Sequence, residues 1–349
     1  MVKNIMFITV ALQGGGAERV MVTIANQMVK KGYHVTFLLV ISDEVVYSLD
    51  PGIQIVKINN GRHRAVRQLL NIRKELKKFG PGTVISFFTN LNILTILANI
   101  GLKNKVIVSE RFDPHFTGKN KLVRFIRNYV YAIADKIIFQ TKDAYDYFPK
   151  PVRRKGIIIP NPIKDNLPHR YTGEREKRIV AYSRLSKEKN IPLLLDACKD
   201  IFDRHDDYVL DIYGTGELEA ELIDYTKKLG IDNRVNYNGF CMDVHNRIRK
   251  AAMYVSSSDV EGLSNSMLEA MAVGIPSICT DCPAGGARMF IKPYENGILI
   301  PVSDVNAMVT AMEYVINSNE LADKLSKNAS KIRGILSVAN IFEKWDEII

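Results

Sequence analysis

The sequence contains few cysteines and no long apolar run, and each absence excludes a class of protein. Four cysteines in 349 residues are too few for a disulfide scaffold, so we expect a reducing compartment. No apolar stretch approaches the roughly 20 residues of a membrane span. The short apolar start at 5–10 lacks a small-residue cleavage site, which favours a buried first strand over a signal peptide. Hydrophobic residues at 46% and charged residues at 25% exclude disorder and collagen.

Two motifs are incomplete. In Gly14–Arg19 the third glycine of a dinucleotide fingerprint is replaced by Arg19, and no P-loop lysine follows. Cys279 and Cys282 form a C-x-x-C that could be redox-active or half of a zinc site, but no second Cys or His pair accompanies it. We therefore interpret the two cysteines as strand-end residues beside a turn.

The net charge of +10 is divided unevenly along the chain. Residues 1–165 hold 26 basic and 11 acidic residues, a net of +15, whereas 166–349 hold 22 and 27, a net of −5. Such asymmetry suggests a polyanionic partner for the first half. A nucleic acid and an anionic membrane surface are both compatible with it.

The hydrophobic pattern predicts two wound halves. Short apolar runs alternate with helical patterns, and the alternation restarts near residue 178 after a Pro- and charge-rich linker at 160–177. This alternation is typical of α/β proteins with parallel sheets, and a length of 349 fits two such domains. The predicted strands are 5–10, 35–41, 53–58, 84–88, 105–109, 136–140, 178–183, 208–213, 235–239, 253–257, 276–280 and 297–302, and 305–349 is predicted to be mostly helical.

Several loops have features suited to phosphate. Gly15 and Gly16 lie between a strand and a helix, where backbone amides can approach a phosphate, or they form a tight turn only. Arg184 and Lys189 follow the first strand of the second half and could clamp a diphosphate, or they belong to a solvated loop. The next strand ends at Gly214 and Gly216, the position for a contact to a base or ribose.

The most specific feature is the stretch 259–272. Glu261 follows a strand, and Ser264 or Asn265 caps the next helix. Glu269 then projects from that helix about 6–7 Å along its axis from the N-terminus. Two carboxylates thus flank a helix end suited to a phosphate. The alternative is that Glu269 is a surface helix residue and Glu261 part of the cap.

These motifs together resemble the retaining glycosyltransferases of the GT-B fold, family 4. The resemblance includes Gly-Gly-Ala-Glu-Arg at 15–19, Arg184 with Lys189, and Glu261-x7-Glu269 followed by Ala-Met-Ala. Residues 109–114 resemble a bacterial subgroup that builds surface polysaccharides and lipid-linked oligosaccharides. The family resemblance implies two Rossmann-like domains that face a central cleft. Residues 1–165 would form the acceptor domain and 166–333 the nucleotide-sugar domain. Residues 334–349 would form a helix that packs back on the first domain.

The resemblance also implies roles for individual residues. Arg184 and Lys189 would bind the donor diphosphate, with Gly15 or Gly16 capping it, and Glu269 would hold the ribose hydroxyls. Glu110 stands where many members carry a histidine that reaches the transferred sugar, and we include it among the catalytic candidates. No cofactor is implied, and the lack of any Asp-x-Asp fits a site without a metal. Glu261 would bind the donor sugar together with the backbone amides of Gly262, Leu263, Ser264 and Asn265.

The expected reaction is therefore transfer of a hexose or N-acetylhexosamine from a nucleotide sugar, with UDP favoured by the subgroup, to a lipid-linked or polysaccharide acceptor through an α-linkage. A sugar-nucleotide epimerase of the same fold is an alternative, although epimerases lack the Glu-x7-Glu followed by Ala-Met-Ala. A nucleic-acid-binding protein is the other alternative, and no recognition motif supports it.

Two basic amphipathic segments of the first half, 62–78 and 119–136, suggest an anionic membrane surface as a partner. Their apolar stripes could instead belong to the core, with the charges forming a solvated face. With a net charge of +15 on this half, we expect a cytoplasmic protein that is peripheral on the inner face of the cell membrane and takes a polyprenyl-diphosphate-linked acceptor.

Overall fold

A computed structural model describes residues 3–42, 44–58, 65–117 and 121–349 of the chain. It divides into two compact units. Unit 1 comprises Met1–Pro162 together with Val338–Ile349, and unit 2 comprises Ile163–Ser337. Each unit is built around its own parallel sheet, so the predicted α/β fold with two doubly wound sheets is confirmed. Among the described residues, no helix combines the length and the hydrophobicity needed to cross a membrane.

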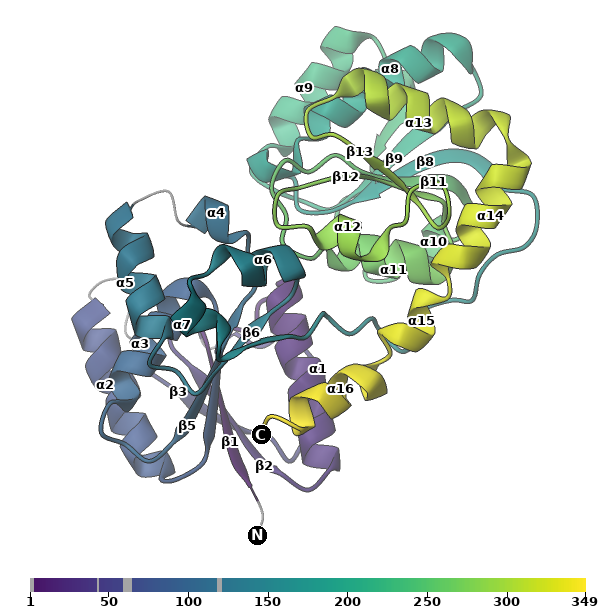
Figure 1. Ribbon diagram of the computed structural model, residues 1–349. Coiled ribbons are helices and arrows are strands. Elements are labelled where there is room, and N and C mark those ends of the chain that lie inside the picture. The colour runs from purple at the N-terminus through teal and green to yellow at the C-terminus, as the bar shows by residue number, and fades with distance from the viewer. Residues whose placement is uncertain (1–2, 43, 59–64, 118–120) are drawn as a thin grey trace. The chain divides into compact units, whose positions relative to one another are not determined.

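Unit 1 has its strands in the order β3-β2-β1-β4-β5-β6-β7 within the described residues (Figure 1). Valine, isoleucine and phenylalanine fill the inner strands because both faces of a parallel sheet are covered. Ile5, Phe7 and Phe37 are fully buried, and the rings of the last two stack at 5.2 Å. The strands are β1 (Asn4–Thr9), β2 (His34–Leu39), β3 (Gln54–Lys57), β4 (Thr83–Phe87), β5 (Lys105–Glu110), β6 (Lys136–Phe139) and β7 (Gly156–Ile158).

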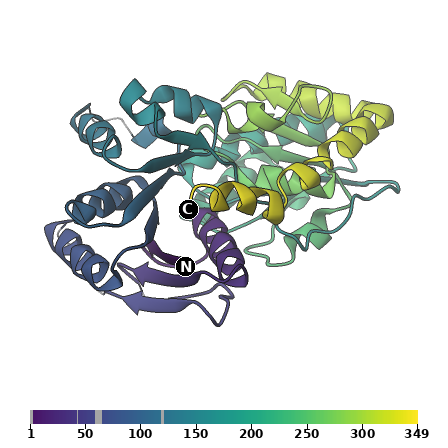
Figure 2. The same cartoon turned by 60° about the horizontal axis from the view of Figure 1, so that its bottom comes forward.

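Helices cover both faces of this sheet. One face carries α2, α3 and α5 side by side, and α1 lies against α16 on the other (Figures 1 and 2). Both chain termini lie in unit 1. The helices are α1 (Gly16–Lys30), α2 (Ala65–Phe79), α3 (Thr89–Asn99), α4 (Pro114–Thr117), α5 (Lys121–Tyr131), α6 (Lys142–Tyr147), α7 (Lys150–Arg153) and α16 (Val338–Asp346).

Helix α16 returns the end of the chain to unit 1. The Asp346 carboxylate accepts hydrogen bonds from Lys31 Nζ and Tyr33 OH, both at 2.6 Å. Trp345 is fully buried, and its ring lies 5.9 Å from that of Phe87 at the end of β4. A helix distant in sequence thus completes the core of unit 1.

Unit 2 has its strands in the order β10-β9-β8-β11-β12-β13 within the part of the chain described. Helices α8, α9 and α13 lie on one face, and α10, α11 and α12 lie on the other (Figure 1). Its elements are β8 (Glu176–Tyr182), α8 (Ile191–Arg204), β9 (Val209–Tyr213), α9 (Glu219–Leu229), β10 (Val235–Tyr237), α10 (Val244–Ile248), β11 (Ala251–Ser256), α11 (Asn265–Val273), β12 (Ser277–Thr280), α12 (Gly286–Phe290), β13 (Ile298–Ile300), α13 (Val305–Asn317), α14 (Asn319–Ala329) and α15 (Ile332–Ile335).

One strand was not predicted from the sequence. Strand β7 pairs in parallel with β6 at the edge of the first sheet. It has only three residues, all half-buried, and the proline-rich linker follows directly. A run this short has too few residues to establish a period, so periodicity alone cannot detect it.

Candidate active site

The predicted donor-binding residues of unit 2 follow three adjacent strands. Strand β8 lies between β9 and β11, so the strand order reverses direction at β8. The connections on its two sides run over opposite faces, and ligands of such sheets bind at the carboxyl ends of the strands at this point. The structure brings together at this edge Arg184 and Lys189 after β8, Gly214 and Gly216 after β9, and Glu261 to Asn265 after β11.

Gly214 and Gly216 allow two of these loops to pack closely. A Cβ atom on Gly214 would lie 1.8 Å from the Ser183 carbonyl oxygen, and one on Gly216 would lie 2.2 Å from that of Leu185. Gly214 also has a φ of +131°, which disfavours any other residue. The loop after β9 therefore packs on the backbone on either side of Arg184.

Lys189 and Glu261 form an ion pair between Nζ and Oε2 across the ends of β8 and β11. Their side chains are only 14% and 23% exposed, so solvent screens this pair less than a surface pair. The Ser257 hydroxyl donates to the Lys189 carbonyl oxygen at 2.9 Å and ties the loop to β11. Arg184 differs from Lys189, because its side chain is 68% exposed and lies 3.7 Å from Glu188.

Hydrogen bonds from an N-cap and from two strand tyrosines hold the first turn of α11 in place. Ser264 is its N-cap, and the Ser264 hydroxyl accepts from the Met267 amide at 3.3 Å. Tyr254 donates to Ser266 Oγ at 3.0 Å, and Tyr182 donates to the Ser266 carbonyl oxygen at 2.5 Å. Burial raises the pKa of both tyrosines well above the usual value, so they remain protonated donors. The positive end of the α11 dipole is therefore held rigidly beside Glu261.

Glu269 is buried in α11 and is not a surface residue, which removes one of the alternatives left open by the sequence. Its Oε2 lies 2.8 Å from His245 Nε2 of α10, and both side chains are less than 10% exposed. The Tyr182 ring lies 5.7 Å from the His245 ring. His245 was not singled out from the sequence, since it is 24 residues from Glu269 and in a different helix.

The Gly285–Gly286 turn supports the loop that carries Glu261. A Cβ atom on Gly286 would lie 2.0 Å from the Gly262 carbonyl oxygen and 3.0 Å from Leu263 Cα. Leu263 itself is buried. A small pocket opens beside this loop, lined by Ser256, Ser258, Glu261, Gly262, Ser264, Met267, Cys279, Thr280, Cys282 and Ala287.

Cys279 and Cys282 are buried free thiols. Cys282 donates from Sγ to the Ser258 carbonyl oxygen at 3.0 Å, and burial raises the pKa of this thiol to about 12. A thiol held protonated is a poor nucleophile and metal ligand. Within the described residues, no three His, Cys, Asp or Glu side chains cluster in a way that could hold a metal ion.

In unit 1, the glycine-rich loop is bonded to its own helix. Glu18 Oε2 accepts from the amides of Gly14 at 3.1 Å and Gly15 at 3.2 Å. The Tyr47 hydroxyl donates to the Gly15 carbonyl oxygen at 2.7 Å. A carboxylate thus occupies the place at the start of α1 where an anion is favoured. The contact of Gly15 or Gly16 with a diphosphate stays a prediction.

Glu110 lies inside unit 1 at the end of β5 and is 2% exposed. Thr89 donates to its Oε1 at 2.8 Å, and Tyr131 donates to its Oε2 at 2.9 Å. Burial raises the pKa of the Glu110 carboxyl, although Arg127 opposes the shift. Both carboxylate oxygens therefore accept a hydrogen bond from a hydroxyl of unit 1. Its catalytic role stays a prediction.

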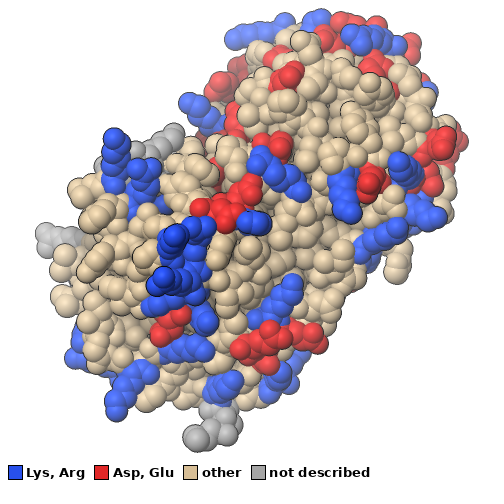
Figure 3. Space-filling view, viewed as in Figure 1, with Lys and Arg blue, Asp and Glu red and all other residues tan. Residues whose placement is uncertain are grey.

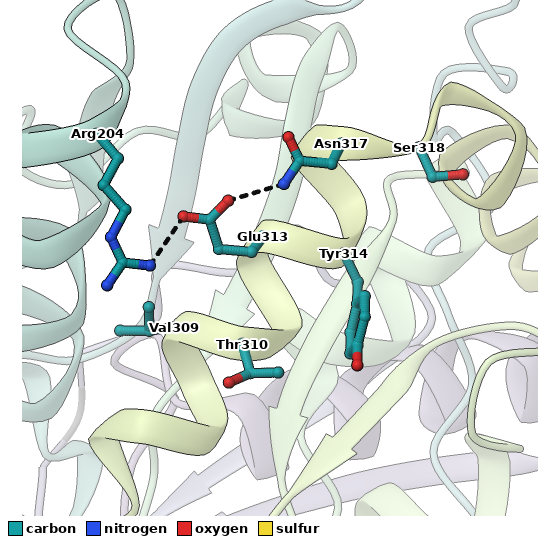
Figure 4. A pocket seen from close by; sticks show the side chains of 7 residues that line it. All are labelled: Arg204, Val309, Thr310, Glu313, Tyr314, Asn317 and Ser318. Carbon is teal, nitrogen blue, oxygen red and sulfur yellow. Dashed lines mark hydrogen bonds and ion pairs between the residues drawn. The ribbon is translucent and has the colours of Figure 1, made fainter.

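A second recess lies between α8 and α13, in unit 2 (Figure 4). Glu313 points into it and accepts from Arg204 at 3.2 Å and from Asn317 at 2.9 Å. His205 Nε2 lies 3.0 Å from the same carboxylate. Burial acts to raise the pKa of the Glu313 carboxyl, but these hydrogen bonds together hold that pKa below its usual value. The partners satisfy each other, so this recess is an ion-pair cluster that joins two helices.

Comparison with known families matches almost the whole chain. The model of Glycosyltransferase Family 4 matches residues 14–167, and that of Glycosyl transferases group 1 matches 165–332. The two matches meet in the linker between the units.

Individual relatives are similar over their full lengths. An uncharacterized glycosyltransferase of Haemophilus influenzae is 28% identical, with 96% of each chain covered. An alpha-1,4-N-acetyl-D-galactosaminyltransferase of Campylobacter jejuni, named for an acceptor that ends in PP-undecaprenol, is also 28% identical, with 99% of this chain and 98% of the relative covered. Among solved structures, Anabaena HepE in complex with UDP and glucose has a TM-score of 0.87 at 16% identity, with 99% of each chain covered, a likeness of fold.

Proposed function

The chain belongs to the group 1 glycosyl transferases, and from this premise we propose that it transfers a sugar from a nucleotide sugar to an acceptor hydroxyl with retention at the anomeric carbon, giving an α-linkage. In this reaction the bond from the anomeric carbon to the diphosphate oxygen breaks. A bond from that carbon to the acceptor oxygen forms, and a nucleoside diphosphate and a proton are released. The main barrier is the negative charge that develops on the departing diphosphate.

The observation that carries the proposal is the Lys189–Glu261 pair in front of the fixed start of α11. A lysine already held in place requires little reorganisation when charge develops on a phosphate oxygen. Arg184 is exposed and only loosely paired with Glu188 at 3.7 Å, and it would exchange this contact for one with the diphosphate. Glu261 would then exchange its contact with Lys189 for one with the donor sugar.

Glu269 is the proposed partner of the ribose hydroxyls. It is buried and fixed by His245, so a ribose would meet a carboxylate already oriented to accept hydrogen bonds. Gly214 and Gly216 would serve the donor indirectly, by letting the loop after β9 pack against the one that carries Arg184.

The proposed donor is a UDP-linked hexose or N-acetylhexosamine, and the proposed acceptor is a glycan on a polyprenyl diphosphate or a polysaccharide. Relatives named for undecaprenol-linked N-acetylgalactosamine transfer and for poly(ribitol-phosphate) N-acetylglucosamine transfer support this choice. The Anabaena structure with bound UDP supports the base.

We further propose that the reaction requires no divalent metal. The cationic side chains of Arg184 and Lys189, together with the α11 dipole, would supply the positive charge that a metal otherwise supplies. Full activity after exhaustive chelation is the expected result. Strict dependence on Mn²⁺ or Mg²⁺ would contradict this part of the proposal.

A two-step experiment tests the function. A thermal-shift screen against UDP-, GDP- and ADP-sugars identifies the base, with stabilisation by UDP-sugars expected. The stabilising sugar is then incubated with a diphosphate-linked glycan, and the anomeric configuration of the product is determined by NMR. An epimerised sugar nucleotide formed without acceptor, or a β-linked product, would contradict the proposal.

A further inference from the structure

Helix α5 presents apolar side chains to solvent and turns a charged one inward. Phe125 is 68% exposed and Tyr129 is 69% exposed, while Ile126 at 42% and Ile133, just beyond the helix, at 48% continue the same strip. Arg127, by contrast, is fully buried. A helix that packs by its apolar stripe shows the reverse arrangement. The possibility that this stripe belongs to the core is therefore wrong for these residues.

The contacts of Arg127 explain this orientation. Its Nη1 donates to Thr117 Oγ1 at 3.0 Å and to the Pro114 carbonyl oxygen at 3.4 Å. Its guanidinium also lies 4.6 Å from the centre of the Phe148 ring. Burying an arginine is costly unless it is bonded, so these contacts fix the helix about its own axis. With Arg127 facing inward, the apolar side chains on the other side of the helix face solvent.

The surface around this strip is basic. Lys121 and Arg124 are exposed on α5, which contains no acidic residue. In Figure 3 the edge of the molecule over α5 is tan and blue without red. Helix α2 lies on the same face of the sheet, with α3 between it and α5, and exposes Val66 and Leu70 together with Arg67, Lys74, Lys77 and Lys78.

The two basic segments of the sequence thus behave differently. In α2 the apolar residues Ile72 and Leu76 are buried in the core, and only the start of the helix exposes apolar groups. Arg62, Arg64 and Lys119, which the sequence placed in these segments, lie outside the described residues. The amphipathic character that faces solvent is therefore concentrated on α5.

We propose that the α5 surface, defined as Lys121, Arg124, Phe125, Ile126, Tyr129 and Ile133, docks on an anionic lipid bilayer. Apolar side chains flanked by basic ones match the boundary between acyl chains and negatively charged headgroups. Tyrosine is enriched at that boundary because its ring is apolar and its hydroxyl is polar. Docking there would place unit 1, the proposed acceptor unit, beside a lipid-linked acceptor.

Charge favours a bilayer over a second copy of the chain. In a symmetric dimer built on this surface, the same patch would meet itself, so Lys121 and Arg124 would face their own counterparts. A bilayer with anionic headgroups supplies the opposite charge instead. A self-association surface is therefore an outcome that the experiment must distinguish.

Flotation with lipid vesicles tests the proposal on the intact chain, without donor or acceptor. Vesicles of phosphatidylcholine with about 30% phosphatidylglycerol should bind the protein at low salt, and binding should fall at high salt and with phosphatidylcholine alone. Phe125→Gln with Tyr129→Gln should weaken binding about tenfold or more. Lys121→Gln and Arg124→Gln should each weaken it about fivefold.

Matched controls lie in unit 2. Ile335 is 61% exposed, so Ile335→Gln removes an equally accessible apolar side chain, and Lys324→Gln removes an exposed charge. Both should bind vesicles like the parent, and all variants should keep the parent melting temperature because the residues are on the surface. Two results would overturn the proposal: no binding to anionic vesicles at low salt, or a concentration-dependent dimer in ultracentrifugation that the Phe125 and Tyr129 changes abolish. Neither result bears on sugar transfer, which is measured separately with a water-soluble acceptor.

Discussion

The charged residues at the carboxyl edges of the two sheets differ in the kind of partner that they bond. In unit 2, Lys189 and Glu261 form a partly exposed ion pair across the ends of β8 and β11, and we propose that a ligand replaces one of the partners. In unit 1, Glu110 is enclosed by Thr89 and Tyr131, and Glu18 is engaged by the amides of its own glycine loop. Groups that pair with each other across two loops can exchange partners, whereas groups bonded to hydroxyls or backbone amides of their own unit maintain the fold. The comparison predicts that the charged residues at the edge of the unit 2 sheet take part in catalysis, and that those at the edge of the unit 1 sheet stabilise the fold.

The sharpest test of this comparison is Lys189→Ala. Loss of a preorganised cation at the developing diphosphate charge should lower kcat/KM by about two to three orders of magnitude, measured as sugar transfer at saturating acceptor. Lys187→Ala removes an exposed charge two residues away and is the matched control, expected within about twofold of the parent. If Lys189→Ala retained nearly full activity, the exchange of ion-pair partners at this edge would be wrong.

A smaller effect is expected from His245, which we regard as a positioning residue for Glu269. His245→Phe leaves the carboxylate without this buried neighbour and should raise KM for the donor about tenfold, with kcat much less affected. His245→Asn keeps an N–H donor and should recover part of the loss. Equal changes in kcat and KM, or no rescue by asparagine, would show that His245 acts through the fold alone.

Glu110→Gln tests the prediction for the unit 1 sheet, and we expect it to change the stability of the protein. Because burial raises the folded-state pKa of Glu110, the folded protein binds this proton more tightly than the unfolded chain does. The parent therefore loses stability as pH rises from the unfolded pKa through the raised folded pKa. Glutamine cannot ionise, so the variant should lack this loss.

Melting curves of Glu110→Gln and the parent across this pH range provide the measurement, and the gap in Tm should widen in favour of the variant as pH rises. Transfer activity should stay within about tenfold of the parent. A loss above about a hundredfold with unchanged Tm would instead assign Glu110 to catalysis, as the family resemblance suggests.

The smallest expected effect is at the recess between α8 and α13. The folded-state pKa of Glu313 is lowered by its partners, so its contribution is present above the unfolded pKa and is lost as pH falls through the folded pKa. Glu313→Gln should lower Tm by about 1–2 °C near neutral pH, and it should leave Tm unchanged at a pH below the folded-state pKa of Glu313. Activity should not change. A marked loss of donor binding would show that the recess is part of the site.

Much of this arrangement could be predicted from the sequence. Strands such as 5–10 and 253–257 were found because buried parallel strands are continuous runs of branched and aromatic residues. Glu261 and Glu269 can be singled out because they have a fixed spacing around a capped helix start, and their roles stay predictions. Both signals are local in the chain.

The residues that were missed depend on distant contacts. Tyr182 and Tyr254 look like ordinary strand residues until both reach Ser266, and His245 has no local mark of its contact with Glu269. The orientation of α5 is equally non-local, because Arg127 is held by Thr117 and Phe148. A periodic pattern identifies an amphipathic helix, but only the neighbours determine which side turns inward.

The return of α16 to unit 1 has a consequence for the order in which the protein is made. Unit 2 is one continuous segment, so it can fold as soon as residue 337 has left the ribosome. Unit 1 is synthesised first but lacks Trp345, and with it part of the cover over Phe87, until the last helix is translated. The unit that begins the chain is therefore the last to be completed. During synthesis its apolar core is incomplete for the entire time that unit 2 takes to emerge.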